Sequence, residues 1–193
     1  TVFDNDGWLD RRIKKDNIKD VYVYYAGHGA PDIDENKGYL IPSGADPNYL
    51  DIAGYPLEEL YEDLADLGAN SVTVFLDACF SGIGRDEAPL LADARGFAVA
   101  IDPVVSGNIT VFSAGSGAEY AVPWHEKRHG LFTYYLMKGL RGDADKNNDK
   151  ILTVDELKNY INEMVPEQAG YLDAEQNPWF HINVPDQILV QYE

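Results

Sequence analysis

Two stretches of sequence decide the fold: VYVYYA at residues 21–26, which runs into GHG at 27–29, and SVTVFLD at residues 71–77, which runs into ACFSG at 78–82. Both are short apolar runs rich in β-branched and aromatic residues, a composition typical of buried strands. The small residues that follow each run indicate a tight turn. We therefore predict two buried strands that each end in a turn.

The segment between these strands has the pattern of an amphipathic helix. Apolar residues recur at helical spacing, and Gly68 is a suitable C-cap. They are Leu57, Leu60, Tyr61, Leu64 and Leu67. A strand, a helix and a second strand predict a right-handed crossover in a parallel sheet.

The remaining elements extend this α/β pattern. The sequence predicts strands at residues 109–113 and 187–192, helices at 131–140 and 153–165 with Pro166 as the end of the second, and a long loop at 83–108 that includes a short strand at 97–101. We predict one domain over residues 1–193, with a mostly parallel sheet flanked by helices.

Composition excludes several classes of protein. With 193 residues and 45% hydrophobic residues, the chain can build a core, which argues against disorder. Its formal charge of −18 would repel nucleic acid and anionic lipid. No apolar run approaches the roughly 20 residues of a membrane helix, so we expect a soluble protein without a membrane partner. One cysteine permits no intrachain disulfide, and nothing in the composition indicates a compartment.

His28 and Cys79 each follow a predicted strand. Because the carboxyl ends of parallel strands meet at one edge of a sheet, we expect the two side chains to lie close together. An imidazole can take the proton of a thiol and later protonate a leaving amine. Each residue alone is more often structural, but the matching positions favour a catalytic pair.

The motifs that contain this pair resemble those of the caspase/metacaspase-like cysteine peptidases, most closely the bacterial caspase-like branch. They are YYAGHG at residues 24–29 and DACFSG at 77–82. GHGAP at 27–31 is also similar to legumain relatives of the same clan, and VFSA at 111–114 and HGLFT at 129–133 resemble the smaller-subunit half of the fold. The resemblance runs from about residue 20 to the end of the chain.

This resemblance implies a cysteine endopeptidase that acts through an acyl-enzyme. Cys79 would be the nucleophile, His28 the general base and acid, and the N–H groups of Gly29 and Cys79 the oxyanion hole. Asp77 would recognise Arg or Lys before the cleaved bond, with Glu119 as a second candidate; alternatively, Asp77 only caps the turn. Cleavage after Asp or Asn, as in caspases and legumain, stays open.

The sequence departs from the family pattern in two places. Phe80 stands where metacaspases commonly have His, and the strand and helix that precede the histidine strand of that fold are missing from the chain. Since residue 1 is Thr, we expect a fragment, a processed product or a trimmed chain. The missing segment would then have been removed, or come from a separate chain such as the N-terminal piece of the precursor. The candidate self-cleavage points are Arg85, Arg95, Lys127 and Arg128.

Residues 145–156 resemble an EF-hand loop within a loop-and-helix unit at 143–165. The expected calcium ligands are Asp145, Asn147, Asp149, the Ile151 carbonyl, Thr153 through water, and Glu156. Lys150 occupies the position that normally needs glycine, so we expect weak affinity, and a relic loop held by Asx turns is the alternative. No organic cofactor is expected.

Other histidines carry less information. His125 and His129 are four residues apart, but their setting predicts solvated side chains, and His181 beside Trp179 predicts packing. The alternative function is an inactive protease-like binding module with a calcium-stabilised loop. A different cysteine-dependent hydrolase or a transpeptidase is the third reading.

Overall fold

The computed structural model describes residues 2–4, 6–32, 37–46, 49–80, 105, 107–115 and 121–193. In these residues the centre of the molecule is a six-stranded sheet. Its strands, in spatial order, are β3 (Tyr55–Pro56), β2 (Lys37–Ile41), β1 (Asp20–Asp32), β4 (Ser71–Cys79), β5 (Ile109–Ser113) and β9 (Trp179–His181).

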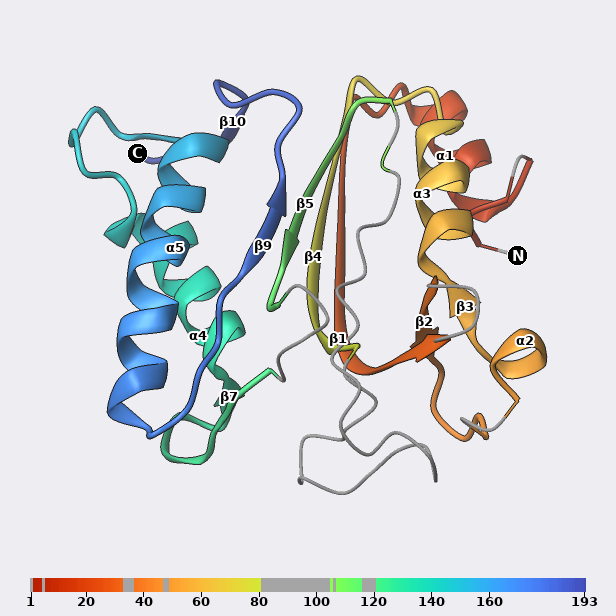
Figure 1. The fold of residues 1–193 in the computed structure, drawn as a ribbon. Helices are drawn as coiled ribbons and strands as arrows, with labels where there is room; N and C mark the ends of the chain where they lie inside the picture. The colour runs from red at the N-terminus through yellow and green to blue at the C-terminus, as the bar shows by residue number, and fades with distance from the viewer. Residues whose placement is uncertain are drawn as a thin grey trace.

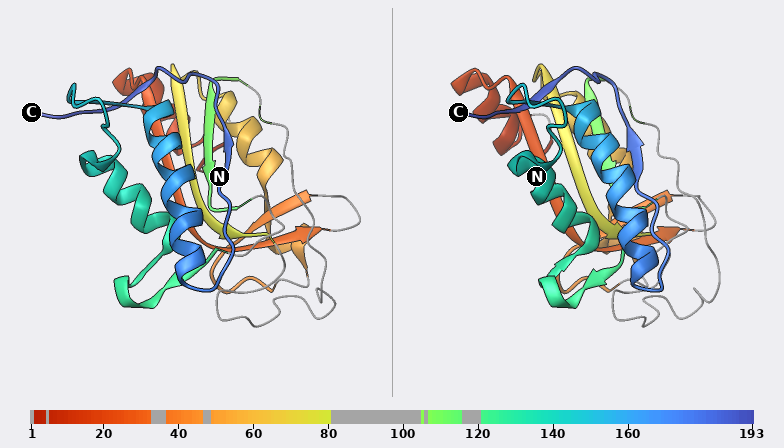
Figure 2. Two further views of the ribbon diagram at one scale, coloured as in Figure 1. Left: turned by 60° about the vertical axis from the view of Figure 1, so that its left-hand side comes forward. Right: turned by 90° about the vertical axis from the view of Figure 1, so that its left-hand side faces the viewer.

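Helices cover both faces of the sheet (Figure 1). One face is covered by α1 (Trp8–Asp16) and α3 (Leu57–Ala65), and the other by α4 (Leu131–Lys138) and α5 (Val154–Tyr171). A short helix, α2 (Leu50–Ala53), precedes β3. In the right-hand view of Figure 2, α4 and α5 lie in front of the sheet.

The centre of the sheet is parallel. β1 pairs with β4 from Asp20↔Ser71 to His28↔Cys79, and β5 pairs with the other edge of β4. β2, β3 and β9 join antiparallel at the two sides. The predicted α/β class and the parallel strand–helix–strand crossover are therefore confirmed.

All nine residues of β4 are buried, because its two faces pack against different helix layers. Val72, Val74 and Leu76 belong to the same hydrophobic core as the apolar residues of α3. Phe75 and Cys79 belong to the core formed with α4 and α5. Since side chains alternate along a strand, Asp77 and Cys79 both face the α4–α5 layer.

The expectation that no helix precedes the histidine strand was wrong, because α1 leads directly into β1. Several predicted boundaries were also wrong. β1 continues to Asp32, because residues 28–32 pair with β2, and β4 runs through Cys79. His28 and Cys79 therefore lie within strands rather than after them. Gly68 has a positive φ of 65°, but it lies beyond the C-cap of α3, which is Asp66.

The predicted end of α5 at Pro166 was also wrong, since this helix reaches Tyr171. A proline cannot donate the backbone hydrogen bond to the residue four positions earlier. However, Val165 and Ala169 on either side of it are fully buried against the core. This burial on both sides of the proline favours continuation of the helix.

The predicted helix at 131–140 is shorter as an α-helix, because α4 ends at Lys138 and a π-helical turn, η2 (Gly139–Asp143), follows. The last predicted strand forms as β10 (Ile188–Gln191), but it pairs with β8 (Ile151–Thr153) outside the main sheet. The predicted loop at 83–108 falls outside the described residues apart from 105, 107 and 108, and so does its strand at 97–101.

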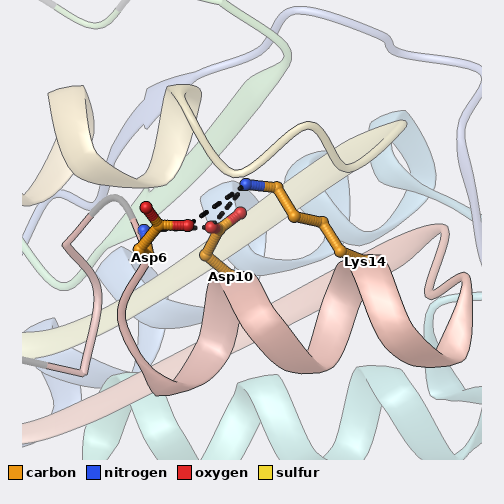
Figure 3. Close-up of polar contacts among 3 residues, drawn as sticks. All are labelled: Asp6, Asp10 and Lys14. Carbon is orange, nitrogen blue, oxygen red and sulfur yellow. Dashed lines mark hydrogen bonds and ion pairs between the residues drawn. The ribbon is translucent and has the colours of Figure 1, made fainter.

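A polar cluster fixes α1, as Figure 3 shows. Asp10 is 1% exposed and accepts hydrogen bonds from Lys14 Nζ at 2.7 Å and from the Asp6 backbone N–H at 3.0 Å. The hydrogen bond from Lys14 lowers the pKa of Asp10 below its usual value, against the opposing effect of burial.

Within the described part of the chain, no helix is long and apolar enough to cross a membrane.

Candidate active site

His28 and Cys79 are direct neighbours in the parallel pair of β1 and β4. Adjacent strands lie about 4.8 Å apart, and residues in register on parallel strands point to the same face. His28 is exposed, whereas Cys79 is 4% exposed. The two residues predicted as a pair are therefore brought together, with His28 exposed and Cys79 buried.

The backbone at His28 is held by the Tyr25 side chain. The Tyr25 hydroxyl lies 2.8 Å from the His28 carbonyl and 3.0 Å from the Ile41 carbonyl of β2. A Cβ at Gly27 would lie 2.6 Å from this same hydroxyl. A larger residue at position 27 would therefore displace the Tyr25 ring, which folds back over this glycine.

Gly29 packs closely against the Cys79 strand. A Cβ at Gly29 would lie 2.6 Å from both the Cys79 carbonyl oxygen and the Phe80 ring. Phe80 is 3% exposed. The departure from the metacaspase pattern at this position thus places a buried aromatic ring beneath Gly29, rather than a second histidine.

The Cys79 sulfur accepts a hydrogen bond from the backbone N–H of Ala121, with an N–Sγ distance of 2.8 Å. Ala121 lies on the chain that leads into the hairpin of β6 (Pro123–Trp124) and β7 (His129–Gly130). A donor to sulfur favours the charged thiolate over the thiol. Sequence patterns cannot reveal this contact, because 42 residues separate its partners.

Asp77 is 1% exposed and lies at the N-terminal end of α4. The Thr133 hydroxyl of α4 donates to Asp77 Oδ2, and a Cβ on Gly130, the residue before this helix, would collide with the same carboxylate. A side chain at position 130 would therefore displace this carboxylate, and the hydroxyl at position 133 ties it to the start of α4. Both residues lie in the HGLFT motif, but their link to Asp77 cannot be read from it.

Tyr24 of β1 extends this contact into a chain of hydroxyl groups. Its hydroxyl lies 2.8 Å from Thr133 Oγ1. Because the single hydroxyl proton of Thr133 goes to the Asp77 carboxylate, the Tyr24 hydroxyl must be the donor to Thr133. The order of donation is therefore Tyr24, Thr133, Asp77.

Tyr24 and Thr133 also line a groove of about 630 Å³ between β1, α4 and β10. Its other walls are mostly apolar. They are formed by Tyr22, Phe75, His129, Leu136, Met137, Leu140, Leu189 and Val190. Tyr22 and Tyr24 are about half exposed, at 50% and 52%.

The β6–β7 hairpin carries the cluster of histidine and basic residues noted in the sequence. His125 lies in a short 3-10 turn, η1 (His125–Lys127), and His129 lies in β7, so they do not share a helix face. Both are exposed, as expected, and they line a pocket of about 330 Å³ with Trp124 and Arg128. Lys127 Nζ lies 5.5 Å from the centre of the Trp124 ring.

The loop at 145–156 is held by three internal hydrogen bonds from backbone N–H groups to side-chain oxygens, and the two that span two residues are Asx turns. The Lys150 N–H donates to Asp145 Oδ2 at 3.1 Å, the Asp149 N–H to Asn147 Oδ1 at 2.8 Å, and the Ile151 N–H to Asp149 Oδ1 at 2.8 Å. Lys150 has a φ of 67°, the left-handed conformation that its position requires.

The following residues anchor this loop to the core. Leu152 is fully buried, as an EF-hand-like loop predicts. Thr153 and Glu156 form a capping box at the start of α5. Helical segments flank the loop on both sides, since η2 ends at Asp143 and α5 begins at Val154.

The fit of the loop to a cation is mixed. Asp145 Oδ1 is a buried oxygen without a hydrogen-bond partner in the described part of the structure, as expected for an atom that a cation could satisfy. However, no three His, Cys, Asp or Glu side chains among the described residues are grouped closely enough to hold a metal ion. Glu156 would have to exchange its bonds in the capping box for a metal.

The remaining predicted residues have different outcomes. Glu119, Arg85 and Arg95 lie outside the described residues. His181 stacks on Trp179 with ring centres 6.5 Å apart, as its packing role predicts.

Comparison with known families identifies the class of protein. The caspase domain family matches residues 8–189, almost the whole chain. The chain therefore belongs to the caspase-domain family and is a cysteine-type peptidase. A search of curated proteins finds no match.

Proposed function

We propose that the chain is an endopeptidase in which Cys79 and His28 form the catalytic dyad. The observation that carries this proposal is their register in adjacent parallel strands. His28 would take the Cys79 proton, and the sulfur would attack the scissile carbonyl carbon. The C–N bond then breaks, and the imidazole gives its proton to the leaving amine. Water, deprotonated by His28, hydrolyses the thioester and restores the thiol.

The backbone N–H groups of Gly29 and Cys79 would stabilise the negative oxygen of the tetrahedral intermediate. The close packing of the Gly29 Cα against the Cys79 carbonyl supports this assignment.

Asp77 would select Arg or Lys before the cleaved bond. It stands two residues before Cys79 on the same face of β4. A buried carboxylate interacts strongly with a cation, because little water screens the charge. Glu119 is the second candidate. The contact of Asp77 with Thr133 equally suits a structural role at the start of α4, and only a substrate comparison separates the two roles.

A segment of the precursor, present as a separate chain, would pair with the outer edge of β1. β2 pairs with this edge only at residues 28–32, and within the described residues no strand pairs with it at 20–27. The apolar groove beside Tyr22 and Tyr24 would receive side chains of that segment. Cleavage after Lys127 or Arg128, both exposed in the hairpin, is the self-processing expected in the described residues.

Calcium would bind the loop at 145–156 and stabilise the packing of α5. The orphaned Asp145 Oδ1 and the positive φ of Lys150 support this proposal. Calorimetric titration of the protein with calcium should give weak binding that Asp145→Asn removes and Asp155→Asn leaves intact. Asp155 is a matched control because it lies in the first turn of α5, outside the expected ligand set. No heat of binding at millimolar calcium would reject the site.

The test of the proposed function is cleavage of fluorogenic peptides that differ only in the residue before the scissile bond: Arg, Lys, Asp, Asn or Ala. We expect turnover of the Arg and Lys peptides, and none with Cys79→Ala or His28→Ala. Turnover of only the Asp or Asn peptides would retain the peptidase and reject the role of Asp77. Silence of the complete precursor on all five would favour the binding-module function.

A further inference from the structure

Gln176 is a fully buried polar side chain in the segment between α5 and β9. It is 1% exposed, and both ends of its amide are hydrogen-bonded. Its Oε1 accepts from the Val122 N–H at 3.0 Å, and its Nε2 donates to the Ala114 carbonyl at 2.9 Å. The side chain thus joins two segments that flank residues 116–120.

Each of these two segments reaches the strand of the nucleophile. Ala114 directly follows β5, and its N–H donates to the Leu76 carbonyl of β4 at 2.8 Å. Val122 directly follows Ala121, whose N–H donates to Cys79 Sγ at 2.8 Å. Gln176 therefore links residues 121–122, which donate the hydrogen bond to the sulfur, to the end of β5, which lies beside the Cys79 strand.

We infer that Gln176 is a positioning residue, which sets the reactivity of Cys79 by fixing the Ala121 N–H against the sulfur. The inference rests on the proposed role of Cys79 as nucleophile. A hydrogen-bond donor stabilises the thiolate relative to the thiol, and the thiolate is the reactive form. Within the described part of the chain, the hydrogen bonds of the Gln176 side chain go to the backbone of Val122 and Ala114, so Gln176 would act on the sulfur through the backbone.

A purely structural role for Gln176 predicts a different result. The amide would then only satisfy two buried backbone groups, and its loss would loosen the surrounding chain. Because Cys79 is 4% exposed, loosening would make the thiol more accessible and its alkylation faster at every pH. Loss of a positioned donor instead moves the pH at which the thiol becomes reactive.

The experiment is alkylation by iodoacetamide, which forms the thioether and releases iodide, followed across pH. Cys79 is the only cysteine of the chain, so the rate reports one site. The variant Gln176→Met keeps the length of the side chain but removes its hydrogen bonds. We expect it to raise the midpoint of the curve of alkylation rate against pH by about half to one pH unit. Below the midpoint, alkylation would then be slower by up to about tenfold. The matched control is Gln187→Met, because the Gln187 amide donates to Ser71 and Thr73 hydroxyls on β4, away from Cys79.

An unchanged midpoint with uniformly faster alkylation in Gln176→Met would overturn the inference. Should this variant not fold, amide hydrogen exchange in the wild-type protein provides the test. We expect slow exchange at Ala121 and Val122, and fast exchange at either would overturn the inference without any substitution. Alkylation needs no substrate, so these outcomes are separate from the peptidase assay: activity retained by Cys79→Ala would reject the nucleophile, whatever the midpoint.

Discussion

Replacing Asp77 by asparagine separates its two proposed roles, substrate recognition and anchoring of α4. The substitution keeps the size of the side chain and an oxygen that can accept from Thr133, but removes the negative charge. In a site this buried, two charges 4 Å apart interact by about 4 kcal/mol at an effective dielectric constant near 20. A charge-assisted hydrogen bond keeps about 1.5–3 kcal/mol of this after desolvation.

This energy corresponds to a factor of about 10 to 150 in substrate preference, since each 1.4 kcal/mol is tenfold. The assay compares kcat/KM for an Arg peptide with that for its citrulline counterpart, which has the same shape without the charge. We expect the Arg-to-citrulline ratio to fall by about this factor in Asp77→Asn, with the citrulline rate changed less than about threefold.

The matched control is Asp20→Asn. Asp20 also accepts from a hydroxyl, that of Ser71 at 2.6 Å, but lies at the opposite end of the same strand pair. Its substitution should leave the ratio unchanged. A lowered melting temperature of Asp77→Asn with an unaltered ratio would refute the recognition role and leave Asp77 as an anchor of α4.

Three further predictions concern the hydroxyl chain, a buried phenol and the α1 cluster. Tyr24→Phe should raise KM for the Arg peptide about threefold with kcat nearly constant, because one hydrogen bond behind Asp77 is lost; an equal effect on the citrulline peptide would contradict this. Tyr160→Phe should leave the melting temperature unchanged or raise it, since the buried Tyr160 hydroxyl has no partner among the described residues, and a marked drop would show that the hydroxyl is bonded. Asp10→Asn should flatten the acid side of the stability curve. The lowered pKa of Asp10 contributes stability above pH 3.8, and this stability is lost as the pH falls through the folded-state pKa. A melting temperature that depends on pH equally in Asp10→Asn and in the wild type, from pH 5 to about pH 2, would contradict this prediction.

Local patterns in the sequence were sufficient to predict the centre of the fold. β5 has the predicted bounds, because ITVFS is a short run rich in β-branched and aromatic residues. The start of α3 follows equally from its leucine spacing. The Cys–His pair could be predicted because both residues directly follow apolar runs that form adjacent parallel strands, in which they lie in register.

Other features depend on contacts that no local pattern reports. β2 was missed because KGYLI is short and forms a strand through its pairing with residues 28–32 of β1. α5 continues through Pro166 because burial outweighs one lost hydrogen bond. The partners of Asp77, Cys79 and Gln176 lie 42 to 62 residues away in the chain, so they could be found only from the folded structure.

The most direct test of the proposed mechanism is mass spectrometry of the protein treated with an Arg-containing peptide that carries a thiol-reactive group at its carboxyl end. The account predicts one covalent adduct, located on Cys79, whose formation is prevented by His28→Ala and by an excess of the cleavable Arg peptide. Peptide cleavage that persists after Cys79 is fully modified would contradict it.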